Sequence, residues 1–130
     1  MNTLTFYQTV MDASSDRRRA EAKRATAAVF HALRDRLTRE EAAQLAAQLP
    51  RELKEIWRAG ERAGRTPVKM HREEFYQRVK EAGLPSIREA RWMTLAVFGA
   101  LKEQLSPGEA EDVLAQLPKD LKEVWAEAQA

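Results

Sequence analysis

Two histidines and one cluster of basic side chains are the residues of this sequence that could do chemistry. His71 precedes Glu74 by three residues, and such a pair on a helix could begin a metal site. The chain has no cysteine and no HExxH spacing, so it offers neither a thiolate ligand nor a zinc-protease motif. We therefore predict no metal, no cofactor and no catalytic residue, with His71 partly buried and His31 at the surface.

The strongest indication of a ligand is the basic stretch DRRRAEAKR at 16–24. Basic side chains in and beyond this stretch could together bind the phosphates of a polyanion: Arg17, Arg18, Arg19, Lys23, Arg24, Arg58, Arg62 and Arg65. Glu21 and Glu61 interrupt this charge, and basic residues near the start of a helix are ordinarily solvated surface. Solvated surface is therefore the favoured interpretation, and nucleic-acid binding is the alternative.

The chain of 130 residues has the length of one ordinary domain. Its formal net charge of +2 gives no overall drive toward nucleic acid or membrane, although residues 1–67 hold 13 Lys and Arg against 9 Asp and Glu. The first ten residues lack a basic leader, and the longest apolar run, 92–98, is too short to span a bilayer. We expect a cytoplasmic protein. Abundant Ala, Leu, Arg and Glu with a single Asn are typical of a thermophile or of a GC-rich genome.

The elements that must position these residues are organised as two copies of one unit. With an offset of 68, residues 25–60 match residues 93–128 at 17 of 36 positions. FYQTV at 6–10 matches FYQRV at 75–79 with an offset of 69. The sequence thus predicts one domain, 1–130, made of a first repeat at 1–60, a joining segment at 61–67 and a second repeat at 68–130.

Each repeat has the hydrophobic pattern of helices, because its apolar residues recur at spacings of three and four. TREE at 38–41, SPGE at 106–109 and SIRE at 86–89 have the pattern of capping boxes, in which the Glu bonds back to the amide of the Ser or Thr. Thr66 and Pro67 are expected to open the first helix of the second repeat.

The long helix that starts after Ser86 is apolar on nearly all sides from Trp92 to Leu101, so we expect it to run through the centre of the molecule. A unit of one repeat is marginal alone, which favours burial of the two repeats against each other. The predicted fold is therefore all-α, a tandem duplication of a four-helix unit packed as one pseudo-twofold helical domain of about eight helices.

AQLPRELKEIW at 47–57 and AQLPKDLKEVW at 115–125 are near-copies of one phrase. Proline lacks an amide donor and restricts the residue before it, so it ends one helix and starts the next. We interpret the phrase as a corner followed by an apolar helix face, rather than as a catalytic motif. The residues with predicted structural roles are Pro50, Leu53, Trp57, Pro118, Leu121 and Trp125, together with Phe30 and Phe98 on the preceding long helices.

ATAAVFHALRDRLTREEAAQLAAQLP at 25–50 and its second copy resemble the bacterial and archaeal family catalogued as domain of unknown function 2267. The resemblance covers essentially the whole chain and rests on the duplicated helix, the capping turn and the QLP corner. It implies an all-helical fold, and it supplies no activity, cofactor or catalytic residue.

Abundant helical apolar surface without a reactive constellation favours a non-enzymatic module that binds protein, either itself as a homo-oligomer or another chain. A nucleic-acid-associated protein that uses the basic patch of the first repeat is the alternative, and neither a membrane nor a small-molecule substrate is inferred. Function is expected where the copies differ: at 17–24, at His31 against Gly99, and along the joining segment.

Overall fold

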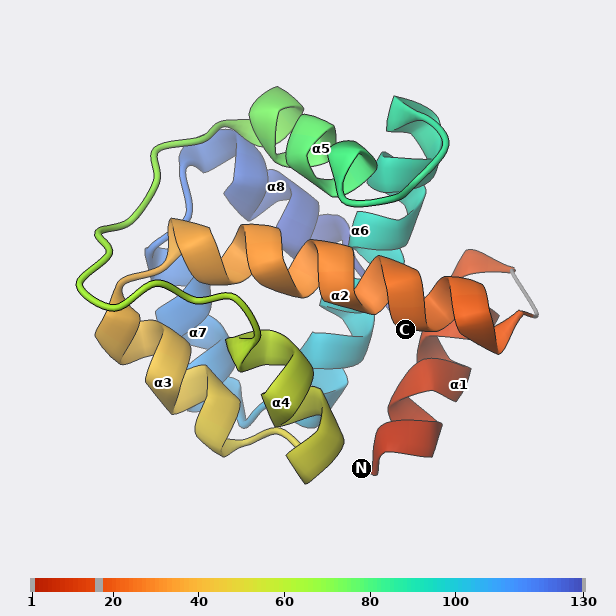
Figure 1. The fold of residues 1–130 in the computed structure, drawn as a ribbon, viewed down its shortest axis with the longest axis horizontal. Helices are drawn as coiled ribbons and strands as arrows, with labels where there is room; N and C mark the ends of the chain where they lie inside the picture. Colours follow the sequence, from red (N-terminus) through yellow and green to blue (C-terminus); the bar gives the residue numbers. More distant parts are fainter. Residues whose placement is uncertain (1, 16–17, 130) are drawn as a thin grey trace.

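The structure, a computed structural model, describes residues 2–15 and 18–129. Within these ranges the chain forms eight helices and no strand, as Figure 1 shows: α1 (Thr3–Ser14), α2 (Arg19–Arg36), α3 (Arg39–Ala47), α4 (Arg51–Arg58), α5 (Arg72–Glu81), α6 (Ile87–Gln104), α7 (Pro107–Ala115) and α8 (Lys119–Glu127). The predicted all-helical class is confirmed. No helix in the described ranges is long and apolar enough to cross a membrane.

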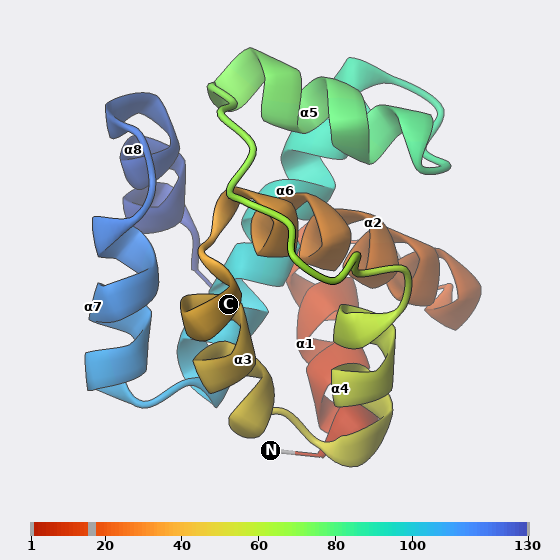
Figure 2. The ribbon, with the colours of Figure 1, turned by 60° about the vertical axis from the view of Figure 1, so that its left-hand side comes forward.

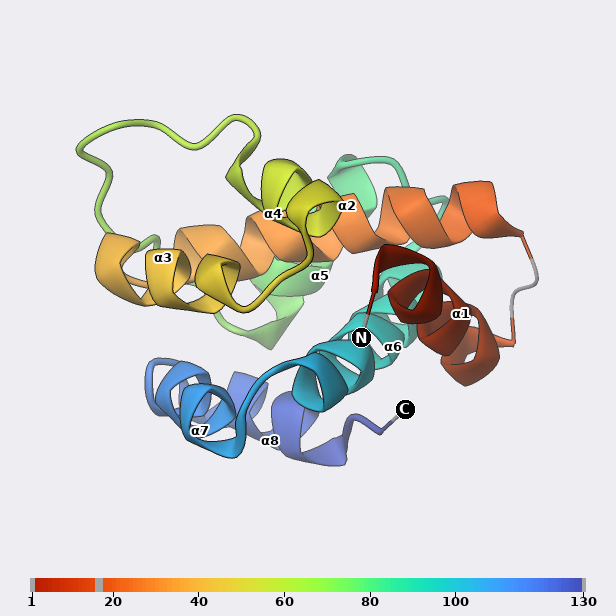
Figure 3. The ribbon, with the colours of Figure 1, turned by 90° about the horizontal axis from the view of Figure 1, so that it is seen from below.

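The helices fall into a first series, α1–α4, and a second series, α5–α8, with matching positions. α2 and α6 begin and end 68 residues apart, as do α3 and α7, and α4 and α8 begin 68 residues apart. The helix contacts within each series also match: α1 contacts α2 and α4, and α5 correspondingly contacts α6 and α8. Between the series, α1 contacts α6 as α5 contacts α2, while α2 meets α6 and α3 meets α7. Figure 3 shows α2, α3 and α4 on one side of the molecule and α6, α7 and α8 on the other.

Each series has a row of aromatic rings in its core. Phe30 on α2 lies between Phe6 and Trp57, with ring centroids 5.7 and 5.3 Å from its own. The matching row of the second series, with centroid distances of 5.6 and 5.0 Å, consists of Phe75, Phe98 and Trp125. Rings at such distances and steep angles attract each other beyond the gain from burial. The rows therefore fix each long helix against the first and last helices of its series.

The two corner phrases connect α3 to α4 and α7 to α8. Pro50 and Pro118 occupy the positions before the first residues of α4 and α8, with ψ angles of 155° and 162° that leave the helical region. Beyond the prolines, Leu53, Leu121 and Trp57 are buried. The chain thus turns at the proline and presents the apolar face of a short helix to the core.

A basic side chain on each long helix holds the end of the last helix in its series. Arg34, 4% exposed, donates from Nη1 to the carbonyls of Trp57 and Ala59 at 3.0 and 2.7 Å. The matching Lys102 of α6 places its Nζ 2.8 and 3.0 Å from two carbonyl oxygens at the end of α8. Carbonyls at a helix C-terminus lack a partner inside the helix, so these side chains satisfy groups that would otherwise be unpaired.

Arg34→Met is expected to lower the free energy of unfolding by about 2 kcal/mol, because the carbonyls of Trp57 and Ala59 lose a charged donor, the first of them in a buried hydrogen bond. Chemical denaturation of both proteins measures the difference. Arg51→Met is the control, since its side chain is 90% exposed beside Glu55, and it should change the stability by less than about 0.5 kcal/mol. Equal stability of Arg34→Met and the wild type would show that water replaces the guanidinium without loss.

The capping boxes predicted at the starts of α3 and α7 form in one direction only. Thr38 and Ser106 accept hydrogen bonds from the backbone N–H groups of Glu41 and Glu109 at 3.1 and 3.2 Å. The pattern also predicts that each glutamate carboxylate accepts a hydrogen bond from the N–H of Thr38 or Ser106. This prediction was wrong in both places, because these N–H groups donate to another acceptor.

That acceptor is the glutamine of the AQLP phrase in the other series. The N–H of Thr38 donates to Gln116 Oε1 at 2.9 Å, and the N–H of Ser106 donates to Gln48 Oε1 at 2.8 Å. Each amide NH₂ returns a hydrogen bond of 3.2 Å to the hydroxyl of the same Thr or Ser. The two glutamines therefore fasten α3 and α7 to the opposite corners, a role that the sequence did not indicate.

The first helix of the second series begins later than predicted. α5 starts at Arg72, not at Thr66, and His71 is its N-cap residue, whose N–H donates to the carboxylate three residues on at 3.3 Å. Before it, the N–H of Val68 donates to the carbonyl of Asp35 at 2.8 Å. This bond holds the chain against the end of α2 in a non-helical conformation, which a local sequence pattern does not encode.

Candidate functional site

The basic residues of 16–24 surround the start of α2, except that Arg17 lies outside the described residues. The exposed members are Arg18, Arg19, Lys23 and Arg24. Arg24 forms an ion pair with Glu21 at 2.9 Å, and the Lys23 ammonium lies 5.9 Å from the ring centroid of Tyr7. The start of α2 is thus a basic patch whose charge is partly offset by its neighbours.

Arg62 and Arg65 of the joining segment lie at the opposite end of α2, where they line a hollow with Arg34 and Asp35. The Arg65 side chain is 9% exposed, donates to two carbonyl oxygens near the end of α2, each at 2.8 Å, and pairs with Glu61 at 2.7 Å. Arg58 and Arg62 are exposed. Because α2 has 18 residues and is about 27 Å long, the structure does not bring Arg62 and Arg65 together with the basic residues at its start.

Both histidine predictions were wrong about burial. The His71 side chain is 74% exposed, and its Nδ1 lies 3.6 Å from the Asp120 carboxylate. As the N-cap residue of α5, it does not follow the helical spacing that placed it beside buried residues. His31, predicted at the surface, is half-buried, with its Nε2 2.7 Å from the carbonyl oxygen of Ile56. One ring nitrogen of each histidine thus makes a contact at the end of a helix, which is a structural role.

The largest exposed apolar side chain of the described residues is on α6. Trp92, predicted in the buried centre, is 49% exposed, and Ile87 in the first turn is 42% exposed. α6 does occupy the centre, since it contacts α1, α2, α5 and α8, but these neighbours leave one face of its first turns open. The matching position on α2 is Arg24. An arginine there was the signal that this position faces outward.

We call Arg88, Arg91, Trp92 and Leu95 the Trp92 surface. These residues share one face of α6 through their spacings of three and four, and they line an open hollow of about 320 Å³. The Arg88 guanidinium lies over the indole, 5.5 Å from its centroid, a cation–π contact that orients the ring. A second hollow of about 210 Å³ lies beyond the ring, between α1, α6 and the end of α8.

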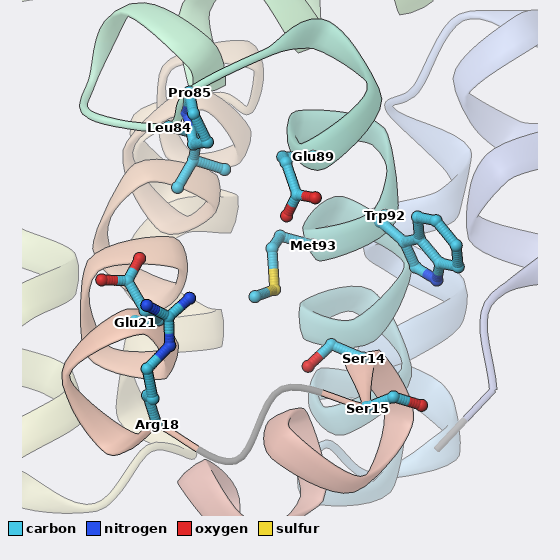
Figure 4. A pocket seen from close by; sticks show the side chains of 9 residues that line it. All are labelled: Ser14, Ser15, Arg18, Glu21, Leu84, Pro85, Glu89, Trp92 and Met93. Atoms are coloured by element: carbon cyan, nitrogen blue, oxygen red, sulfur yellow. The ribbon is translucent and has the colours of Figure 1, made fainter.

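A third hollow, of about 600 Å³, is bounded by the end of α1, the start of α2 and the first turns of α6. Figure 4 shows Glu89 and Met93 extending from α6 toward this hollow, with Arg18 and Glu21 on the facing wall. Trp92 lies on the outer side of α6 in the same view. The indole is therefore a ridge between three hollows, each of which it helps to line.

One group of carboxylates in the described ranges has the proximity that a metal ion needs. Glu41 of α3 and Glu109 and Asp112 of α7 offer oxygens within 4.8 Å of one another. Burial first, and then a hydrogen bond to Glu109 and the charges of Glu109 and Asp112, raise the pKa of Glu41 from its ordinary value of 4.5 to about 8. Sequence reasoning missed this group because it assigned both glutamates to helix caps.

A protein-family model matches most of the chain. The model described as Uncharacterized conserved protein (DUF2267) matches residues 3–124, which include α1–α7 and most of α8. Among curated proteins, none matches the sequence. The match confirms the family resemblance that the sequence indicated. The chain therefore belongs to the DUF2267 family of uncharacterised conserved proteins.

Proposed function

We propose that this protein is a non-enzymatic helical module that binds a segment of another protein through the Trp92 surface. The observation that carries the proposal is the exposure of Trp92, 49%, on a ridge between three hollows. Binding energy in protein interfaces concentrates on Trp, Tyr and Arg side chains that become buried in such hollows. The Trp92 surface has this composition.

The charge of the Trp92 surface indicates the chemistry of the partner. Arg88 and Arg91 flank the indole, so the complementary ligand is an acidic segment with one or two large apolar side chains. A twofold pairing of this surface with itself would place the arginines of two copies against each other, which is unfavourable. The proposed partner is therefore a different chain rather than a second copy.

We propose further that the chain is a tandem duplication packed about a pseudo-twofold axis. The matching helix positions and the repeated helix contacts support this proposal. In such an arrangement Arg91 and Trp92 of α6 take the places of Lys23 and Arg24 of α2. One face would then be basic in the first repeat and aromatic in the second, so that the second alone binds an apolar side chain.

Nucleic-acid binding by the first repeat, the alternative from the sequence, receives less support. A polyanion would have to reach basic groups at both ends of α2, or be held at its start, where Arg24 already pairs with Glu21. Binding of a random DNA duplex at about 50 mM salt that disappears in the double variant Arg19→Glu and Lys23→Glu would favour this alternative.

Selection of peptides by display on the whole protein tests the proposed function. The selected peptides should carry acidic residues around an aromatic residue or leucine. A labelled synthetic copy should lose about ten-fold or more in affinity to Trp92→Ala and to Arg91→Glu. Leu4→Ala is the matched control, because it removes a side chain that is 60% exposed on α1, and it should leave the affinity unchanged.

Two results would contradict the proposal. Basic peptides among the selected set would show that the arginines do not choose the partner, and undiminished binding to Trp92→Ala would show that the indole is not the anchor. Light scattering separates self-association: a dimer that forms with rising concentration and is lost in Trp92→Ala would assign the surface to a second copy of the chain.

A further inference from the structure

The glutamates near the starts of α3 and α7 approach each other where these two helices meet. Figure 2 shows α3 and α7 side by side, and the two helices are in contact. Glu41 and Glu109 occupy the third position of their helices, and Asp112 adds a carboxylate three residues further along α7. One oxygen from each of the three lies within 4.8 Å of the others. We call Glu41, Glu109 and Asp112 the acidic seam.

The helix caps do not use these glutamates. In a capping box the carboxylate would accept the N–H of Thr38 or Ser106, and here Gln116 and Gln48 accept those N–H groups instead. The glutamate carboxylates therefore do not accept the N–H groups of their own helix caps, and the contact between α3 and α7 brings them close together.

The acidic seam has buried oxygens without partners. Glu41 and Glu109 are 7% and 8% exposed, and in the described part of the chain Oε2 of each is buried without a hydrogen bond. Among the described residues no Lys, Arg or His forms an ion pair with any of the three carboxylates. Adjacent buried carboxylates without a counter-charge are unfavourable, so the seam favours either a shared proton or a bound cation.

We propose that the acidic seam binds one divalent cation of the size of Ca²⁺. Carboxylate oxygens are the ligands that Ca²⁺ prefers, at about 2.3–2.6 Å, so its ligands can lie up to about 5 Å apart. The three carboxylate oxygens lie within 4.8 Å of one another, which fits this span, and Mg²⁺ is disfavoured because it dehydrates reluctantly and is usually bound by only one or two carboxylates. The site is independent of the Trp92 surface.

The exposed Asp112 gives the site an opening to solvent. Through it the ion would enter, and water would complete a coordination shell to which the protein supplies three carboxylates. The position that matches Asp112 on α3 is Gln44, which is also exposed. The seam is thus asymmetric in charge, and Gln44→Glu would offer a fourth carboxylate from the opposite helix.

Calorimetric titration of the chelator-treated whole protein with CaCl₂ tests the site. One Ca²⁺ should bind per chain and raise the unfolding temperature. Asp112→Asn, an exposed substitution that leaves the core intact, should weaken binding about ten-fold or more, and Glu41→Gln should abolish it. Gln44→Glu should tighten it. Glu111→Gln, which removes a neighbouring exposed carboxylate of α7, is the matched control and should bind as the wild type does.

Absence of both heat and a shift in unfolding temperature at about 10 mM Ca²⁺ would overturn the proposal, since even weak protein sites are filled there. The seam would then hold a shared proton only. An equal stabilisation by MgCl₂, or an equal loss in Glu111→Gln and Asp112→Asn, would also overturn it, because both indicate general screening of negative charge rather than a site.

Discussion

Trp57→Ala is expected to lower the free energy of unfolding by about 3–5 kcal/mol, whereas Trp92→Ala should change it by less than about 0.5 kcal/mol. Trp57 is 1% exposed, its ring lies 5.3 Å from that of Phe30, and its indole N–H donates to the carbonyl of Ala42 at 3.0 Å. Removal of the Trp57 ring leaves a cavity and removes an aromatic contact and a buried hydrogen bond, whereas removal of the Trp92 ring gives up only partial burial.

Guanidinium denaturation of the two variants and the wild type provides the measurement. The comparison is internally controlled, because both substitutions remove the same side chain from the same protein. A similar destabilisation by Trp92→Ala would mean that its ring is buried against the protein, and the Trp92 surface could not then serve as an open docking face. Retained stability in Trp57→Ala would contradict the conclusion that the apolar face of α4 is packed into the core.

The second large effect is expected from pH. In a chelating, metal-free buffer the free energy of unfolding should fall as the pH rises from about 4.5 to about 8. Burial, followed by the hydrogen bond and charge of Glu109 and the charge of Asp112, raises the pKa of Glu41 to about 8. The folded protein therefore keeps a proton through this window that the unfolded chain releases. This contribution to stability is complete below about pH 4.5 and is lost above about pH 8. Between these limits the free energy of unfolding falls by up to about 1.4 kcal/mol per pH unit.

Urea titrations at several pH values across this window measure the slope. Glu41→Gln should flatten it, because the amide has no proton to lose and fills the same space. The adjacent Glu40→Gln is the control, since Glu40 is exposed on α3 and its removal should leave the slope as in the wild type. A profile that is flat in the wild type would show that water or a counter-ion relieves the seam.

The fold class and several helix starts could be predicted from the sequence because their signals are local. The starts of α3, α6 and α7 are set by a Ser or Thr and the amide three residues on, and all three bonds form as the pattern predicts. The prolines of the corner phrases likewise act on their own neighbours.

What could not be predicted depends on residues far apart in the chain. Gln116 and Thr38 are 78 residues apart, and Gln48 and Ser106 are 58 apart. The hydrogen bonds of these pairs nevertheless use the N–H groups that the glutamates of the capping boxes would otherwise accept. The exposure of Trp92 likewise depends on which helices cover α6, and hydrophobic periodicity alone assigned it to the core. The candidate site was therefore largely invisible in the sequence, apart from the contrast between Arg24 and Trp92.

The exchange of glutamines between the two corners has a consequence for how this sequence can vary. Gln48 completes a helix cap in the second series, and Gln116 completes one in the first. A substitution at either glutamine is therefore expected to remove a helix cap from the half of the chain to which that glutamine does not belong. A change at Arg24 or Trp92, on the outward faces of α2 and α6, is by contrast expected to alter only the face that carries it. The two corners are therefore mechanically coupled, and the two outward faces are not.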